Sequence, residues 1–230
     1  MAERGIVRLN KTAEEFNDLG KEELTRGHFQ EAINMFTRAM EADPQYSESY
    51  CNIGNVLAAT GRQEDAVGYF MKAIELAPES PLAYYGMGNV YFNLGNYESS
   101  RVAFEKAQNK GMNHQDLYFM IAMSYLQSER YNEAINAFDK CLSIHPHDVE
   151  AHFNKGMALA RFNRLEEARD AFITAIELDP QHDDAHFNLG IAYAFLGQLE
   201  QSEQQLKKAL EINPSHILAE NALEELRKMG

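Results

Sequence analysis

A period of 34 residues governs this sequence. Small residues recur at that spacing at Gly20, Gly54, Gly88, Ala122, Gly156 and Gly190. A second small residue follows each of them after twelve positions, and a large apolar residue follows four positions later, Phe in five of the six units. A chain with such a period folds as stacked copies of one supersecondary unit, because a single copy cannot bury its apolar face alone.

Each unit has the pattern of two helices. In the second 34-residue repeat, apolar residues at spacings of three and four run over 47–60 and again over 63–76. Gly61 lies between them, where a residue in the left-handed conformation ends a helix at low cost. Gly27, Gly95 and Gly197 take the same place in other repeats, and Glu129 and Asn163 take it in the fourth and fifth repeats. The sequence therefore predicts one helical hairpin per unit, with the recurrent Gly or Ala allowing its two helices to approach closely.

Proline closes five of the units, at Pro44, Pro78, Pro146, Pro180 and Pro214. The complete pattern resembles the tetratricopeptide repeat, whose motif has Gly or Ala, Ala, Phe, Ala and Pro at these offsets. The chain also resembles small free-standing bacterial members of that family. The resemblance implies an all-α fold, an α-solenoid coiled as a right-handed superhelix of six helix-turn-helix hairpins. Their expected ranges within 13–216 are 13–46, 47–80, 81–114, 115–148, 149–182 and 183–216.

The two ends and one internal turn depart from the repeat. Residues 217–230 predict one more amphipathic helix, which would cap the last hairpin, and residues 1–12 lack periodicity and are expected to be flexible. The segment at 110–115, KGMNHQ, lacks the proline and aspartate of the other units. We expect a different turn there without a change of register.

Composition and charge exclude several classes of protein. The chain is 45% hydrophobic and 24% charged, as in soluble folded proteins, and its 35 acidic against 21 basic residues give a formal charge of -14. No basic stripe stands apart, so nucleic-acid binding is not expected. No signal-peptide core and no run of roughly 18 apolar residues occurs, which predicts a cytoplasmic protein without membrane contact. Cys51 and Cys141 form no CxxC pair and are predicted to be reduced thiols.

No pattern in the sequence predicts catalysis. His182 and His186 have the four-residue spacing of a helical zinc pair, which would suit metal-dependent hydrolysis. The glutamate of the HExxH motif is absent, however, and His186, like His152, occupies a repeat position that holds a packed aromatic ring. The glycines follow the repeat and do not form a phosphate-binding loop. We therefore expect a non-enzymatic protein with no metal and no cofactor.

The resemblance places candidate ligand contacts on the first helix of each hairpin, which lines the concave face in this family. Repeat positions 2, 5, 6, 9, 12 and 13 would then face the groove, position 1 being the first residue of each unit. The predicted peptide-binding residues are Asn17, Asn52, Asn55, Tyr85, Asn89, Phe92, Asn93, Phe119, Met123, Phe153, Asn154, Met157, Phe187, Asn188 and Ile191.

These residues divide into two chemical groups. Asparagine prevails toward the N-terminal half, and its amide can pair with a ligand peptide group as donor and acceptor together. Phe and Met prevail toward the C-terminal half, where clustered apolar side chains mark an interaction surface. The alternatives are that the asparagines are tolerated on a solvated helix face, and that the apolar residues pack between neighbouring hairpins.

Acidic residues at repeat position 2 form a predicted rim, at Glu48, Asp116, Glu150 and Asp184. They also suit the first turn of a helix, where a carboxylate complements the helix dipole. With the charge of -14, an acidic rim predicts a neutral or basic ligand. The carboxylate-clamp subfamily, which binds acidic C-terminal tails of chaperones, has Lys, Asn and Arg where this chain has Asn17, Lys21, Asn52, Leu82 and Gly86. Only Asn52 matches, so an acidic chaperone tail is not the expected partner.

The sequence thus predicts a protein-interaction scaffold or adaptor that binds an extended peptide or a helix of a partner protein in its groove. The alternative is a structural assembly module that self-associates by stacking hairpins. A capping helix over 217–230 argues against open stacking.

Overall fold

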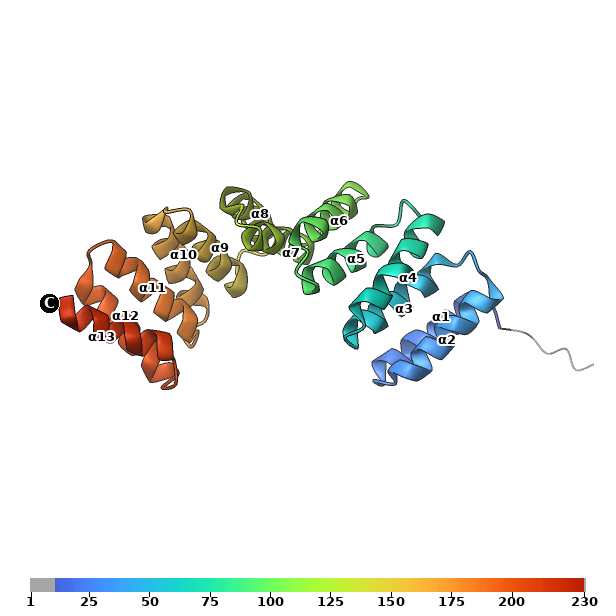
Figure 1. Cartoon of the computed structure of the whole chain (residues 1–230), viewed down its shortest axis with the longest axis horizontal. Helices are drawn as coiled ribbons and strands as arrows, with labels where there is room; N and C mark the ends of the chain where they lie inside the picture. The colour runs from blue at the N-terminus through green and yellow to red at the C-terminus, as the bar shows by residue number, and fades with distance from the viewer. Residues whose placement is uncertain (1–10, 230) are drawn as a thin grey trace, which may run out of the picture. The chain divides into compact units, whose positions relative to one another are not determined.

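The computed structural model describes residues 11–229, which form thirteen α-helices (Figure 1). The predicted flexible segment 1–12 lies outside the described residues except for Lys11 and Thr12. The helices form two compact units, one ending at Met112 and the other beginning at Asn113. Across residues 11–229, no helix has the length and apolar character needed to cross a membrane.

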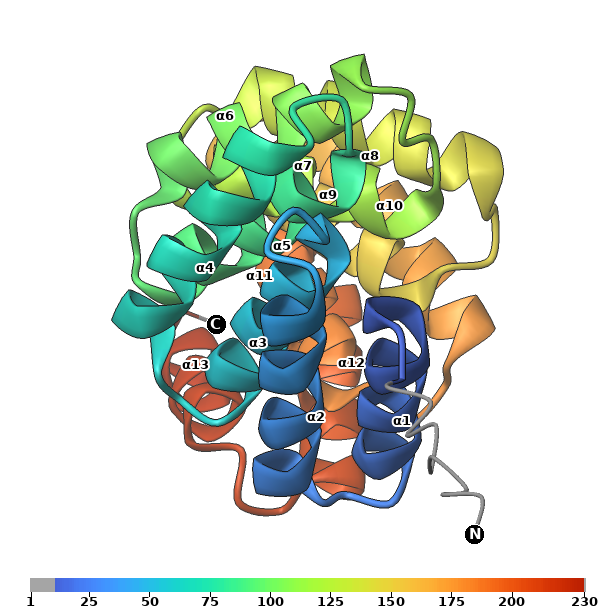
Figure 2. The same ribbon diagram turned by 90° about the vertical axis from the view of Figure 1, so that its right-hand side faces the viewer.

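Three hairpins make up the first unit. Their first helices (A) and second helices (B) are α1 (Ala13–Thr25) with α2 (Phe29–Ala42), α3 (Ser47–Ala59) with α4 (Gln63–Leu76), and α5 (Pro81–Asn93) with α6 (Tyr97–Asn109). The two helices of a hairpin lie side by side, as Figure 2 shows for α1 and α2. Helix α2 also packs on α3, and α4 on α5, so that the hairpins stack on one another.

The second unit holds three more hairpins and a final helix. The pairs are α7 (Gln115–Gln127) with α8 (Tyr131–Ile144), α9 (Val149–Arg161) with α10 (Leu165–Leu178), and α11 (Asp183–Phe195) with α12 (Leu199–Ile212), followed by α13 (Ile217–Met229). Leu223 and Leu226 of α13 join Leu206 and Ala209 of α12 in one buried cluster. The prediction of an all-α solenoid of six hairpins and a last helix is confirmed.

A left-handed residue ends the A helix of every hairpin in the described chain. Gly27, Gly61, Gly95 and Gly197 have φ between 74° and 82°. Glu129 and Asn163 adopt the same conformation at 59° and 62°, although they carry a Cβ. The repeat therefore imposes the turn geometry even where glycine is replaced, as the sequence pattern predicts.

Close helix contact explains the recurrent small residue. The rings of Phe36, Phe70, Phe104, Phe138 and Phe172 are at most 1% exposed. A Cβ added to Gly88 would lie 2.6 Å from the ring of Phe104, and one added to Gly156 would lie 2.6 Å from the ring of Phe172. The rings of Phe104 and Phe172 thus occupy the space that a side chain at these glycine positions of the A helix would need.

The turn after α6 differs from the others, as predicted. Helix α6 ends at Asn109, and Gly111 is left-handed at φ 95°. The amide of Met112 then donates to the carbonyl of Ala107 at 3.1 Å, which ends the helix without proline. Helix α7 still begins 34 residues after α5, so the register is kept.

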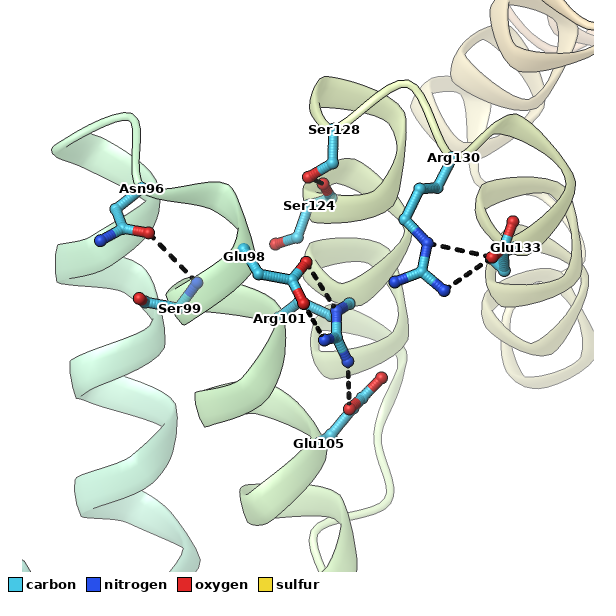
Figure 3. A network of polar contacts seen from close by, with 9 residues as sticks. All are labelled: Asn96, Glu98, Ser99, Arg101, Glu105, Ser124, Ser128, Arg130 and Glu133. Carbon is cyan, nitrogen blue, oxygen red and sulfur yellow. Dashed lines mark hydrogen bonds and ion pairs between the residues drawn. The ribbon is translucent and has the colours of Figure 1, made fainter.

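Ion pairs form along the B helices, at α6 and α8 (Figure 3). On α6, Arg101 pairs with Glu98 and donates to Glu105 at 2.6 Å. On α8, Arg130, the residue before the helix, lies 2.7 Å from Glu133. An exposed pair at this spacing, such as Arg130 with Glu133, contributes at most about 1 kcal/mol, since water screens it.

Candidate functional site

A hydrogen-bond network joins the first two hairpins. The amide of Asn52 on α3 donates to Oδ1 of Asn17 on α1 at 2.8 Å. Asn17 Nδ2 lies 3.5 Å from the hydroxyl of Tyr46, which donates to Glu48 at 3.0 Å. Glu48 also lies 2.6 Å from Lys21 Nζ. The side chain of Asn17 is completely buried. Contrary to the sequence-based expectation, it does not line an open groove. It instead orients Asn52 by accepting the hydrogen bond from its amide.

The charges of this network are fixed by their neighbours. Burial raises the pKa of Glu48, but hydrogen bonds from Lys21 and Tyr46 outweigh it and leave that pKa below its ordinary value. The hydrogen bond to Glu48 raises the pKa of Lys21. Burial, and then the contact with Glu48, raise the pKa of Tyr46 to about 12. Glu48 and Lys21 therefore form a charged pair in which each neutralises the other.

A pocket of about 410 Å³ lies between α3 and α5. Its walls come mainly from repeat positions 2, 5, 6 and 9 of two successive hairpins: Glu48, Cys51, Asn52 and Asn55 on α3, and Leu82, Tyr85, Gly86 and Asn89 on α5. Four of the predicted peptide contacts and one predicted rim residue are thus brought together in one cavity.

Several polar groups of this pocket have no protein partner. Among residues 11–229, no group hydrogen-bonds to the side chains of Asn55 and Asn89 or to Oδ1 of Asn52. Gly86 lies beside Asn55, because a Cβ added to it would be 3.2 Å from Asn55 Oδ1. The pocket therefore offers amide donors and acceptors that a ligand could satisfy.

The two cysteines are buried thiols. Cys51 lines the same pocket but is only 8% exposed, and burial raises its pKa to about 11. Cys141 is completely buried, and burial raises its pKa to about 12. Neither forms a disulfide. Both thiols keep their proton at neutral pH, which does not suit a nucleophile.

Two predicted contacts at the end of α5 lie outside the pocket. Phe92 packs edge-on against Tyr97, with 5.3 Å between ring centroids. Asn93, the last residue of the helix, is exposed. The structure does not bring either residue into the cavity between α3 and α5.

In the second unit, the A helices α7, α9 and α11 each carry a half-buried Phe at repeat position 5. These are Phe119, Phe153 and Phe187. The ring of Phe119 lies edge-on to that of Phe138, with centroids 5.8 Å apart, and Phe153 lies 5.9 Å from Phe172. Core aromatic residues thus hold the surface rings from below.

Two histidines outside the predicted set support this row. The ring of Phe153 packs against His182 at 4.6 Å and that of Phe187 against His216 at 4.9 Å. His182 Nδ1 accepts the backbone N–H of Ala185, and His216 caps α13 in the same way. The signal was present in the sequence, because both histidines directly precede an A helix and lie 34 residues apart.

A second pocket, of about 260 Å³, lies between α7 and α9. Its lining residues are Leu126, Gln127, Glu129, Tyr131, Phe153, Asn154, Met157 and Arg161. Phe153, Asn154 and Met157 of the predicted set meet here. Met123 is half-buried on α7, while Phe187 and Ile191 on α11 pack against the buried cluster of α13.

The asparagines of the second unit differ from those of the first. Asn154 donates its amide to the carbonyl of Glu150, and Asn188 donates to that of Asp184, both at 2.8 Å. Each side chain therefore satisfies a backbone acceptor of its own helix, and its Oδ1 is left as an acceptor.

The predicted acidic rim also differs between the units. Asp116, Glu150 and Asp184 are exposed in the first turns of their helices. Within the described chain no Lys or Arg pairs with them, whereas Glu48 is paired with Lys21. The basic groups beside these carboxylates are histidine rings. Ring nitrogens of His114, His182 and His216 lie 4.0, 3.8 and 3.2 Å from carboxylate oxygens of Asp116, Glu150 and Asp184 respectively. The second unit thus presents carboxylates that Lys and Arg do not neutralise.

The two histidines with zinc-like spacing have separate protein partners. His186 Nδ1 lies 2.7 Å from Gln205 Oε1, and its Nε2 lies 3.3 Å from the carbonyl of Pro180. His182 instead caps α11. Over residues 11–229, no group of three or more His, Cys, Asp and Glu side chains is arranged to hold a metal ion.

Family models of the tetratricopeptide repeat match five parts of the chain, 35–68, 54–95, 81–114, 119–183 and 183–216. No curated protein matches it. Together the matched segments span most of the described helices.

Solved structures agree with these matches. YrrB, described as a TPR protein with an unusual peptide-binding site, is 35% identical with a TM-score of 0.76, and the match covers 82% of this chain and 97% of YrrB. MamA from Desulfovibrio magneticus RS-1 (24% identity, TM-score 0.71, 74% and 96% covered) and pilF from Pseudomonas aeruginosa (14%, 0.75, 95% and 97%) share the fold. The chain belongs to the tetratricopeptide repeat family, whose members are protein-interaction scaffolds.

Proposed function

We propose that this protein is a non-enzymatic adaptor that binds a peptide segment of a partner protein on its A-helix surface. The observation that carries the proposal is the pocket between α3 and α5, where the side-chain amides of Asn55 and Asn89 and Oδ1 of Asn52 have no hydrogen-bond partner among residues 11–229. An extended peptide has unpaired N–H and C=O groups along its edges, and these are the groups that an amide side chain can satisfy together.

The pocket has the size and the walls for such a ligand. Its volume of about 410 Å³ falls in the range of common ligand sites, about 300–1,000 Å³. Tyr85 forms an apolar wall and is held by Phe104, with 5.4 Å between ring centroids. Because Asn17 fixes Asn52 before a ligand arrives, less side-chain freedom is lost on binding.

Charge selects against an acidic ligand. Lys21 occupies a position where carboxylate clamps hold their ligand, but here it is paired with Glu48 at 2.6 Å. Leu82 and Gly86 stand where those clamps carry cations. The proposed partner segment is therefore neutral or basic and is not an acidic chaperone tail.

The comparison with YrrB supports peptide binding, because this chain spans 97% of that protein and YrrB is described by its peptide-binding site. Cys51 and Cys141 are free thiols in the structure, and a reducing cytosol would keep them in that state.

Partner capture with a matched pair of variants tests the proposal. The groove variant carries Asn52→Ala, Asn55→Ala and Asn89→Ala, and the control carries Asn34→Ala, Asn132→Ala and Asn136→Ala, which change exposed residues of B helices. We expect the groove variant to recover at most about a tenth of the partner, since each lost hydrogen bond costs about 0.5–1.5 kcal/mol. Equal recovery by the two variants, with equal helicity, would refute the proposal.

A further inference from the structure

The A helices of the second unit carry three rows of side chains that repeat every 34 residues. Position 2 is acidic in Asp116, Glu150 and Asp184, position 5 is Phe in Phe119, Phe153 and Phe187, and position 9 is Met123, Met157 and Ile191. Successive A helices of this unit contact one another from α7 to α13. The rows therefore run across neighbouring helices, with the acidic residues along one edge and apolar side chains beside them.

The apolar surface continues past these rows. Phe195, at position 13 of α11, is 73% exposed, and Leu218, at position 2 of α13, is 61% exposed. Leu218 stands where the three preceding A helices have an acid. Exposed apolar groups of this size on the surface that carries the Phe row favour a partner that covers them.

The surface is also ordered before binding. Phe153 is held between Phe172 and His182, and Phe187 lies against His216. These contacts fix the rings, so that a partner loses little side-chain entropy by packing on them.

The spacing of the rows distinguishes a helical from an extended ligand. Axes of packed helices lie about 8–10 Å apart, so each row offers one side chain about every 10 Å. Residues seven apart on a helix are separated by about 10.5 Å. Same-face residues of an extended strand recur about every 6.7 Å and do not match the rows.

We propose that the second unit binds an amphipathic helix of a partner protein, with the helix's apolar face on the Phe and Met–Ile rows and its Lys or Arg flank beside Asp116, Glu150 and Asp184. This inference rests on the proposed function and names the partner for one part of the surface. Charge favours the basic flank, because the three carboxylates lack Lys and Arg partners within residues 11–229.

The first unit does not share this surface. At position 5 it has the buried Asn17, then Cys51 and Tyr85, and at position 9 it has Lys21, Asn55 and Asn89. The helix site is therefore assigned to the second unit, and the peptide pocket between α3 and α5 keeps its own ligand.

The test is selection of 20-residue peptides from a randomised display library on the full chain. Selected peptides should show apolar residues at helical spacing with Lys or Arg on one flank, and should gain helical circular dichroism on binding. Their affinity should fall about tenfold for Asp116→Asn, Glu150→Gln and Asp184→Asn combined. The control, Glu31→Gln, Glu64→Gln and Glu166→Gln combined, makes the same charge change in first turns of B helices and should keep affinity within about twofold.

Other outcomes overturn the helix site in distinguishable ways. Selected peptides without helical spacing or a basic flank, or equal affinity for both triple variants, would contradict it. If such peptides lose affinity with Asn55→Ala and Asn89→Ala, the proposed function stands without the helix site. If no peptide is selected and no partner is captured, both fail. The chain alone could also form a dimer that the combined Asp116→Asn, Glu150→Gln and Asp184→Asn variant dissociates. In that case a second copy of the chain, and not a partner helix, would occupy this surface.

Discussion

The amide of Asn52 donates to the buried Oδ1 of Asn17 at 2.8 Å, across the junction between the first two hairpins. This bond uses the donor side of Asn52, and within the described chain its Oδ1 has no hydrogen-bond donor. The buried Asn17 thereby sets the orientation of Asn52, which faces the pocket.

Replacing Asn17 by Ala should weaken both folding and binding. The change removes a hydrogen bond made by a buried side chain and leaves the half-buried Asn52 without its acceptor, so we expect the free energy of unfolding to fall by about 1–3 kcal/mol. Urea denaturation measures that loss, and calorimetry with a captured partner segment should show weaker binding. Asn34→Ala, at an exposed position, should change stability by less than about 0.5 kcal/mol.

Two glycines on helices should respond in opposite directions to alanine. A Cβ on Gly86 would overlap the buried ring of Phe70, whereas one on Gly68 would meet nothing within 4 Å. We expect Gly86→Ala to destabilise the protein by about 1–3 kcal/mol through overpacking. Gly68→Ala should stabilise it by about 0.5–1 kcal/mol, because glycine is unfavourable inside a helix. Thermal unfolding compares the two, and equal effects would show that the backbone of α5 does not lie against Phe70.

The two non-glycine turn residues give a second pair. Glu129 and Asn163 hold φ values of 59° and 62°. A left-handed residue with a Cβ costs about 1–2 kcal/mol, and Asn tolerates that conformation better than Glu. Glu129→Gly should therefore raise the free energy of unfolding more than Asn163→Gly does, as measured in urea. The reverse order would contradict the strain assigned to Glu129.

The pair of Glu48 and Lys21 predicts a specific pH dependence. The pKa of Glu48 is lowered from 4.5, so its contribution to stability is complete above that value and is lost as the pH falls through the lowered pKa. The pKa of Lys21 is raised from 10.5, so its contribution is complete below that value and is lost in stronger alkali. The urea midpoint of the wild-type protein should exceed that of Glu48→Gln by a constant amount between about pH 5 and 10, and the gap should narrow as the pH falls through the lowered pKa of Glu48. The absence of a gap at neutral pH, or a gap that already narrows well above pH 4.5, would contradict the pairing.

The fold could be predicted in detail because the same helical-hairpin pattern recurs six times with one period. The left-handed turns at Glu129 and Asn163 follow from their place in the repeat, not from their own propensities. The pocket was predictable in part, since Asn55 and Asn89 stand at the same repeat position on neighbouring helices.

What the period could not predict are contacts made by individual side chains. Asn17 occupies a repeat position of the groove, yet Asn52 and Tyr46 cover it and bury it. The packing of His182 and His216 on the Phe row likewise depends on residues that precede the helices and lie outside the family motif. Such contacts depend on neighbouring hairpins, which a single repeat does not describe.

Photo-crosslinking tests most directly whether the A-helix surface is the binding surface. A photoreactive amino acid replaces Asn55, in the pocket, or Asn136, exposed on the B helix α8. The protein is then irradiated with its captured partner. We predict a covalent adduct from position 55 and none from position 136. An adduct that forms only from position 136, or equally from both, would contradict the account.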